Sequence, residues 1–209
     1  MLSPADHLVL TIDKAVRASF GAAQARRASP DEALPEAELA PAERQHAAAL
    51  MRVNHCGEVC AQALYQGQSL ASDNPRIKHA LAKAASEEED HLAWCERRIE
   101  ALGGRTSLLN PLWYAGSLAI GFAAGKLGDA WNLGFLRETE KQVERHLQGH
   151  LDRLSGSDLR TRAVVAAMQG DEAGHARTAE ALGARELPAP VKSVMRVAAR
   201  VMTATSYWL

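Results

Sequence analysis

Two Glu-x-x-His pairs constrain the fold of this chain more strongly than any other feature. Glu88 and His91 lie three residues apart in the stretch SEEEDHLAWCE, and Glu172 and His175 repeat this spacing in DEAGH. Each pair falls on an apolar stripe with helical periodicity, which is the side that a bundle helix normally buries. A buried carboxylate costs several kcal/mol unless it is paired or binds a metal ion. Both pairs therefore require partners inside a helical core.

A single glutamate on another helical stripe precedes each pair. The interval from Glu58 to Glu88 is nearly equal to the interval from Glu140 to Glu172. The turn SDNPRI lies midway in the first interval and SGSD midway in the second, and the Asn-Pro step offers a helix cap followed by proline. Helices joined by so short a turn lie antiparallel, which puts both glutamates of a hairpin at the same height. The sequence therefore predicts two hairpins with the same plan.

We predict an all-α fold, a ferritin-like four-helix bundle in which a long apolar crossover joins two antiparallel helical hairpins. Additional helices are expected at the N- and C-terminal ends, and 209 residues suffice for one such domain. Residues 1–40 are interpreted as an amphipathic helix and a linker, and residues 41–209 as the bundle, with the crossover at 105–130 and the C-terminal helix at 190–209. The expected helices span residues 3–20, 41–72, 75–102, 129–154, 159–182 and 191–209.

Composition and charge narrow the class of protein. A formal net charge of -1 argues against a nucleic-acid partner. Cys56, Cys60 and Cys95 are odd in number and lie within helical patterns, which is typical of reduced thiols in a reducing compartment. The N-terminal residues lack the apolar segment of a signal peptide, and no stretch reaches the roughly 20 apolar residues that span a bilayer.

The crossover contains an unusually apolar segment. Leu112 to Gly125, with the sequence LWYAGSLAIGFAAG, contains no charged residue. Two interpretations stay open: a helix buried across the end of the bundle, or a surface that enters the lipid interface or lines a tunnel for an apolar substrate.

The final helix carries basic and apolar faces. Its basic stripe consists of Lys192, Arg196 and Arg200. The opposite face consists of Val194, Val197, Val201 and the terminal Tyr207-Trp208-Leu209. This pattern suits an anionic membrane surface, although the solvated face of an ordinary packing helix has the same pattern. We therefore expect a peripheral membrane protein on the cytoplasmic side of the cell membrane.

Four glutamates and two histidines in a helical core are most simply explained by a pair of metal ions. Ferritin-like di-metal proteins take one glutamate from each of two helices and a Glu-x-x-His pair from each of the other two. The candidate metal ligands, which are also the candidate catalytic residues, are Glu58, Glu88, His91, Glu140, Glu172 and His175. Their oxygen-rich set favours iron or manganese over zinc. We expect two iron ions per chain, with manganese as the second choice.

Two alternatives concern the ligand set. Glu144 lies one turn beyond Glu140 on roughly the same face, and Glu140 is preferred for its matched distance. A competing zinc site would consist of Cys56, Cys60, Cys95 and His91. The zinc site is disfavoured because it leaves the Glu140 half of the pattern without a purpose.

Other residues are candidates for positions behind the ligands. Glu87 and Asp171 precede the two pairs directly and could accept the second N–H of a histidine. His146 could also lie behind the ligands. Tyr65 is interpreted as a core tyrosine and His55 as an ordinary helix residue, and either could contact a ligand.

The chain also resembles a known family. The stretch MRVNHCGEVCAQALYQGQ at residues 51–68 is similar to the signature MRV-(Asp/Asn)-His-x-Gly-Glu of the demethoxyubiquinone hydroxylases of ubiquinone biosynthesis. The spacing of EEEDH, of Glu140 with His146, and of DEAGH is similar too. The resemblance covers about residues 42–209, and residues 1–40 lie outside it. It implies that the six candidate ligands bind two irons.

The resemblance further implies a reaction and its partners. The expected enzyme is a di-iron, O2-dependent monooxygenase that hydroxylates the ring of a polyprenylated demethoxyubiquinol, 2-polyprenyl-3-methyl-6-methoxy-1,4-benzoquinol. One oxygen atom enters the product and the other leaves as water, so the reaction needs two electrons. The sequence lacks a GxGxxG nucleotide fingerprint, so these electrons are expected from an electron-donor protein, an added reductant or the quinol itself. Other ubiquinone-biosynthesis proteins and a homo-oligomer are further expected partners.

The alternative function is that of a ferritin-like protein that oxidises and stores iron. Storage explains the ligands equally well, but it explains neither the apolar crossover nor the basic, aromatic-ended C-terminal helix. A storage protein requires a closed cage of many subunits, so the size of the protein in solution separates the two functions.

Overall fold

The computed structural model describes residues 3–209, and over these residues the chain forms seven helices and no strand. The helices are α1 (Pro4–Phe20), α2 (Pro41–Ala71), α3 (Pro75–Ala101), α4 (Asn110–Lys126), α5 (Asp129–Leu151), α6 (Leu159–Ala181) and α7 (Ala189–Trp208). The predicted all-α class is confirmed. The bounds of the six predicted helices differ from the observed bounds by at most three residues, and α4 fills the predicted crossover.

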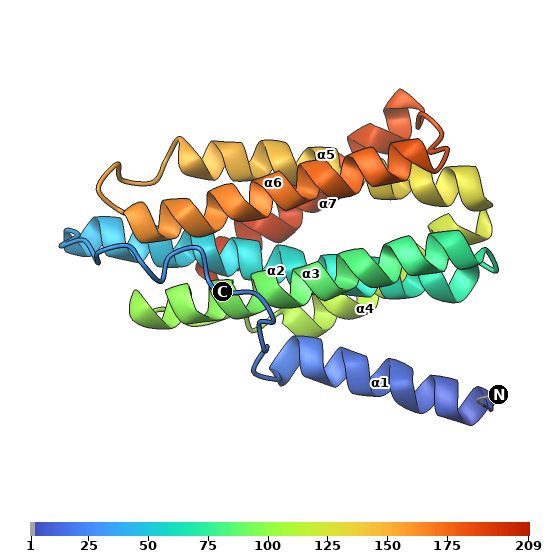
Figure 1. Ribbon diagram of the computed structural model, residues 1–209, viewed down its shortest axis with the longest axis horizontal. Helices are drawn as coiled ribbons and strands as arrows, with labels where there is room; N and C mark the ends of the chain where they lie inside the picture. The colour runs from blue at the N-terminus through green and yellow to red at the C-terminus, as the bar shows by residue number, and fades with distance from the viewer. Residues whose placement is uncertain (1–2) are drawn as a thin grey trace.

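Two antiparallel hairpins form the bundle. α2 pairs with α3, α5 pairs with α6, and the hairpins meet where α2 contacts α5 and α3 contacts α6 (Figure 1). α4 packs along α2, α1 packs against α4, and α7 packs against α2 and α5. The predicted ferritin-like four-helix bundle with additional terminal helices is confirmed.

Helix ends follow the caps that the sequence provides. The hydroxyl of Ser3 accepts a hydrogen bond from the backbone N–H of Asp6 at 3.2 Å. The side chain of Asn74 accepts one from the backbone N–H of Arg76 at 3.0 Å, with proline in the first turn of α3. These contacts satisfy N–H groups that a helix leaves unpaired at its start. They explain why the predicted starts of α1 and α3 are nearly correct.

The end of α5 differs from the prediction. α5 ends at Leu151, whereas the apolar periodicity predicts Leu154. The backbone N–H groups of Arg153 and Leu154 both donate to the carbonyl of His150, at 3.0 and 2.9 Å. The chain therefore tightens into a turn while the apolar pattern continues.

The crossover helix α4 lies close against α2. A Cβ atom on Gly121 would overlap the backbone carbonyl of Leu64, and a Cβ atom on Gly67 would overlap the carbonyl of Leu118. Only glycine allows two helix backbones to approach this closely. The outward side of α4 is exposed, with Leu112 62% exposed. Of the two interpretations of the crossover, burial across the end of the bundle is therefore wrong.

The C-terminal helix α7 lies on the surface. Its buried residue is Ser206, and Tyr207 turns inward so that its hydroxyl lies 2.7 Å from Nδ1 of His46. Lys192 forms ion pairs with Glu186 and Glu138. The predicted basic stripe is therefore reduced to two exposed cations, Arg196 and Arg200.

The linker between α1 and α2 forms no helix, as predicted, and runs along the bundle. The backbone N–H of Ala23 donates to Glu96 at 3.0 Å, and Arg160 donates to the carbonyl of Leu34 at 2.7 Å. The buried guanidinium of Arg98 donates to Glu36 at 2.8 Å. Polar contacts therefore hold the linker on α3 and α6.

The apolar core has two main clusters inside the bundle. One includes Leu50, Met51, Trp94, Ile99, Leu147, Val164 and Met168. The other includes Tyr65, Ile77, Leu81, Leu133, Leu136 and Ala179. Along each bundle helix, the polar residues described next lie between these two clusters, so apolar side chains close the centre at both ends.

Candidate metal centre

Six side chains from four helices meet in the middle of the bundle. They are Glu58 of α2, Glu88 and His91 of α3, Glu140 of α5, and Glu172 and His175 of α6. Each of them is between 0% and 6% exposed. The helical hairpins thus bring together all six candidate ligands, as their matched spacing predicts.

Among the described residues, the ligand atoms form two groups, each with all atoms within 4.8 Å of one another. The first contains Glu58, Glu88, His91 and Glu172, and the second contains Glu88, Glu140, Glu172 and His175. Two carboxylates, those of Glu88 and Glu172, belong to both groups. They could bridge two metal positions.

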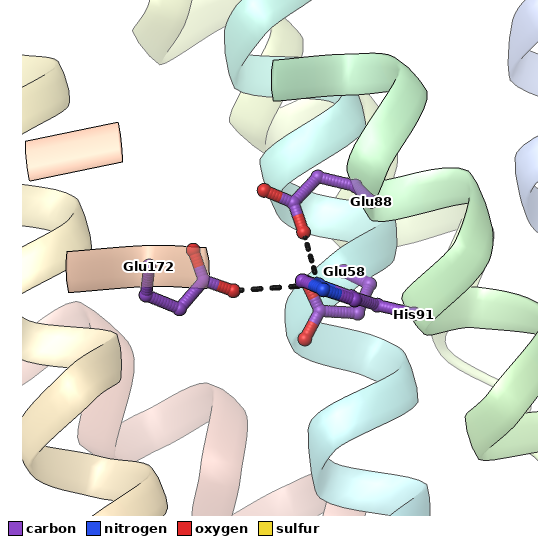
Figure 2. Close-up of side chains that lie close together, drawn as sticks. All are labelled: Glu58, Glu88, His91 and Glu172. Carbon is purple, nitrogen blue, oxygen red and sulfur yellow. Dashed lines mark hydrogen bonds and ion pairs between the residues drawn. The ribbon is translucent and has the colours of Figure 1, made fainter. Parts of the chain in front are cut away.

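The histidines turn the same ring nitrogen toward the carboxylates. Nδ1 of His91 lies 2.7 Å from Glu88 Oε2 and 3.5 Å from Glu172 Oε1. Figure 2 draws these two contacts as dashed lines. Nδ1 of His175 lies 3.2 Å from Glu88 Oε1 and 3.2 Å from Glu172 Oε2. Each group therefore has one imidazole nitrogen directed at the shared carboxylates.

The other ring nitrogen of each histidine contacts an acid of the opposite hairpin. Nε2 of His91 lies 2.9 Å from Asp171 Oδ2, and Nε2 of His175 lies 2.6 Å from Glu87 Oε2. A carboxylate in this place accepts the N–H of a metal-bound imidazole and fixes its orientation. The predicted contacts of Glu87 and Asp171 with the histidines are therefore present, and they cross between the hairpins.

Tyr65 lies closer to the ligands than its interpretation as a core tyrosine suggests. Its buried hydroxyl donates to Glu88 at 3.0 Å and also contacts Glu140. The sequence contains a signal for this, because Tyr65 lies two helical turns beyond Glu58 and so on the same stripe.

Burial and charge set the electrostatics of the centre. Burial, together with the nearby carboxylates, raises the pKa of Glu58 and of Glu140. Burial acts to lower the pKa of His175, but the carboxylates outweigh it and raise that pKa to about 12. The same balance raises the pKa of His91. Burial acts to raise the pKa of Glu88, but the two histidines outweigh it and lower that pKa.

The residues fit a pair of divalent cations. Four buried carboxylates share the space with only two histidines, and Glu172 Oε1 is buried with no hydrogen-bond partner. A buried cluster with more acids than cations and a buried oxygen without a hydrogen bond are both costly. Two divalent ions would neutralise the carboxylates and provide the missing partner.

Several residues considered in the sequence lie elsewhere. Glu144 belongs to neither group of ligand atoms, whereas Glu140 belongs to the second. His146 packs against His150, with ring centroids 4.0 Å apart. His55 contacts Glu96 at 3.2 Å and so has a structural place between α2 and α3.

The competing zinc site is wrong. Cys95 lies 3.8 Å from the sulfur of Met168, and Cys56 accepts a hydrogen bond from Ser206 at 3.1 Å. No cysteine occurs in a candidate metal-binding group among residues 3–209. The thiols therefore belong to the packing of the bundle.

Comparisons with known proteins find a matching family and many similar chains. A family described as "Ubiquinone biosynthesis protein COQ7" matches residues 45–206. The 3-demethoxyubiquinol 3-hydroxylase of Nitrosospira multiformis is 60% identical over 204 residues, covering 98% of both chains. The protein of the same name from Dechloromonas aromatica is 58% identical over 206 residues, covering 99% of both chains. The similarity to these relatives thus includes most of residues 1–40, which the resemblance by sequence motifs left outside.

Proposed function

This chain belongs to the COQ7 family of ubiquinone biosynthesis proteins, and on that premise we propose that it is a 3-demethoxyubiquinol 3-hydroxylase that uses two iron ions. The observation that carries the proposal is the pair of ligand groups that share Glu88 and Glu172. The curated relatives are named as hydroxylases, which disfavours the iron-storage alternative.

The ligand assignment follows the two groups. One iron would be held by Glu58 and His91, the other by Glu140 and His175, with the shared carboxylates between them. When bound, two ferrous ions supply electrons and Lewis acidity for the activation of dioxygen. The donor set is rich in oxygen with one imidazole per metal, which suits iron.

The chain itself orients the ligands and excludes water. Asp171 and Glu87 hold the Nε2 protons of the two histidines, so each Nδ1 is available to a metal. Tyr65 holds the carboxylates of Glu88 and Glu140. The two apolar clusters flank the ligands along the bundle axis, which keeps bulk water from the reacting centre.

The substrate class requires access from a lipid phase. The proposed substrate is a benzoquinol with a polyprenyl tail, and it receives one oxygen atom on its ring. The second oxygen atom leaves as water, so an electron donor must provide two electrons. The use of an electron donor and a homo-oligomeric assembly stay predictions.

We further propose that the protein binds the cytoplasmic surface of the cell membrane. Among the described residues, no helix combines the length and the apolarity needed to cross a bilayer. Exposed apolar side chains occur on α1, α4 and α7, including Phe20, Leu112 and Trp208. Two exposed cations on α7, Arg196 and Arg200, would attract anionic headgroups.

Metal content and product formation test the hydroxylase. We expect about two irons per chain, and 18O from dioxygen in the hydroxylated ring of a short-tailed demethoxyubiquinol. Glu58→Ala and Glu172→Ala should each lose iron and reduce turnover by about 100-fold or more. Glu144→Ala is the matched control, because Glu144 lies on α5 outside both ligand groups. Retention of two irons and of turnover in the Glu172 variant would refute the assignment.

Vesicle flotation tests the membrane proposal. Val194→Ser combined with Val197→Ser removes exposed apolar groups of α7 without touching the core. We expect binding to anionic vesicles to weaken by about 10-fold, because two apolar side chains that would enter the lipid interface are lost. Val164→Ala, a core change on α6, serves as a control for general destabilisation. Equal flotation of the double variant and the parent would contradict the proposal for α7.

A further inference from the structure

The two acids that orient the histidines have different surroundings. Asp171, which faces His91, also accepts a hydrogen bond from Arg27 Nη1 at 2.8 Å, on the same oxygen that contacts the imidazole. Glu87, which faces His175, accepts one from Lys83 at 2.8 Å on its other oxygen. The Lys83 side chain is 66% exposed. The acid that contacts His91 is thus held by a linker residue, Arg27. The acid that contacts His175 is held only by Lys83, a solvated lysine of the same helix, α3.

Arg27 is fixed at several points. Its Nε donates to Asp90 Oδ2 at 2.6 Å, and the backbone N–H groups of Arg26 and Arg27 donate to Asp90 Oδ1 at 2.6 and 3.3 Å. Asp90 is 3% exposed, so this carboxylate depends on the linker for its partners. The guanidinium also lies over the ring of Trp94, 4.7 Å from the centroid. Two carboxylates and an aromatic face suit the planar guanidinium and not the ammonium group of lysine.

The contacts of Arg27 reach His91 by two routes. The first passes through Asp171, and the second passes through Trp94, whose ring centroid lies 5.4 Å from that of His91. Both routes end on the same imidazole. For His175, the acid that faces the imidazole is Glu87, and Glu87 pairs with Lys83 of α3 and not with a linker residue.

The position of Arg27 depends on these polar contacts. An open pocket of about 440 Å³ lies between the linker and α3, and its lining includes the charged residues Arg27, Glu96 and Arg97 as well as alanines. Arg27 itself lines this pocket, and its side chain is 41% exposed. Asp90 and Asp171 are the groups that hold Arg27 in place over the centre.

We propose that Arg27 is a positioning residue for the His91 half of the metal centre, which it fixes through Asp171 and Trp94. The inference rests on the proposed di-metal function. Groups that orient a metal-bound histidine change metal affinity by about 10–100-fold. Loss of Arg27 therefore weakens the metal position that contains His91 by this factor. The position that contains His175 keeps its affinity, so the two positions are held unequally.

The first test measures ferrous iron binding to the full chain in competition with a chelator. Arg27→Met removes the guanidinium but keeps a long side chain, and we expect one of two dissociation constants to rise about 10–100-fold. Arg27→Lys should restore little of the lost iron affinity, because lysine cannot bridge the carboxylates of Asp90 and Asp171. Arg26→Met is the matched control, since the Arg26 side chain is exposed and contacts Ser86 and Glu89 at the surface. Lys83→Met is the control for the other half, with both constants expected to stay as in the parent.

The second test uses the metal-free protein with 15N-labelled histidine. The Nε2 protons of His91 and His175 are assigned with His91→Gln and His175→Gln, and their exchange with water is measured by NMR. Arg27→Met should speed the exchange of the His91 proton about tenfold or more, because its acceptor Asp171 is no longer fixed. The His175 proton should exchange as in the parent.

The outcomes separate this inference from the proposed function. An unchanged His91 proton in Arg27→Met, or equal weakening of both metal positions, would overturn the positioning role. Fewer than two irons bound by the parent chain would overturn the di-metal function, while the NMR experiment would still decide the role of Arg27. Thermal unfolding of each variant confirms that the compared proteins are folded.

Discussion

Asp171 on α6 places its Oδ2 atom 2.9 Å from Nε2 of His91 on α3, so an acid of one hairpin holds a histidine of the other. Glu87 on α3 does the same for His175 on α6. The two contacts tie the hairpins together at the height of the ligands. The same two contacts therefore join the hairpins and orient the imidazoles.

Removing Asp171 should weaken iron binding. In Asp171→Ala, the Nε2 proton of His91 loses its acceptor, and we expect iron affinity to fall about 10–100-fold. The metal-free protein should also lose about 1–3 kcal/mol of unfolding free energy, because a buried donor is left unpaired. Chelator competition and urea denaturation measure the two effects. Glu89→Ala removes a more exposed acid of α3 and should leave both quantities unchanged.

Tyr65→Phe should destabilise the metal-free protein. The hydroxyl of Tyr65 donates to the buried carboxylate of Glu88 and also contacts Glu140, and a hydrogen bond to a charged group contributes about 1.5–3 kcal/mol. We expect a loss of about 2–3 kcal/mol in urea denaturation. Tyr114→Phe is the control, because Tyr114 donates to the neutral amide of Gln66 and its loss should cost about 1 kcal/mol. Equal losses in the two variants would show that the carboxylates do not depend on Tyr65.

The ligands were predictable from sequence because they combine two signals. Glu88 and Glu172 are charged residues on apolar helical stripes, and each has a histidine three residues later. Charge on a buried face demands compensation, and matched spacing indicates where the compensation lies. Helix bounds were predictable for a similar reason, because caps such as Asn74 act locally.

Other features depend on how the hairpins meet, which sequence periodicity does not specify. Glu87 and Asp171 are marked as candidates by their position, but their crossing follows from the contact of α3 with α6. Arg27 carries no periodic signal, because it lies in an irregular linker far along the chain from Asp171. The close approach of Gly121 to Leu64 likewise emerges only when α4 is placed on α2.

Gly121→Ala should separate α4 from α2. The new methyl group would overlap the carbonyl of Leu64, which is backbone and cannot rotate away. We expect a loss of about 1–3 kcal/mol in unfolding free energy, as in other overpacked cores. Gly116→Ala, in the same helix, has open space around the added methyl group. It should be neutral or stabilising by up to about 1 kcal/mol, since alanine favours a helix over glycine. A similar loss in both variants would contradict close packing at Gly121.

Acidification should destabilise the bundle through two histidines of α5, the buried His150 and the half-buried His146. Burial lowers the pKa of His150 to about 2 and that of His146 to about 4, and neither ring nitrogen of His150 has a hydrogen-bond partner. The folded-state pKa values lie below the unfolded value of about 6.5, so the unfolded chain binds more protons as the pH falls. Stability is therefore fully present above about pH 6.5 and decreases toward the folded pKa values.

The dependence of the unfolding free energy on pH tests the role of these histidines. Each contributes about 1.4 kcal/mol per pH unit, which amounts to about 2 kcal/mol for each at pH 5. In His150→Leu, the loss of unfolding free energy between pH 7 and pH 5 should be smaller than in the parent by about 2 kcal/mol. Urea denaturation of the metal-free proteins at both pH values measures the difference, and comparison with the parent removes the contribution of the carboxylate cluster. His79→Gln, an exposed change on α3, is the control. An unchanged slope in His150→Leu would mean that His150 takes up its proton in the folded protein as readily as in the unfolded chain.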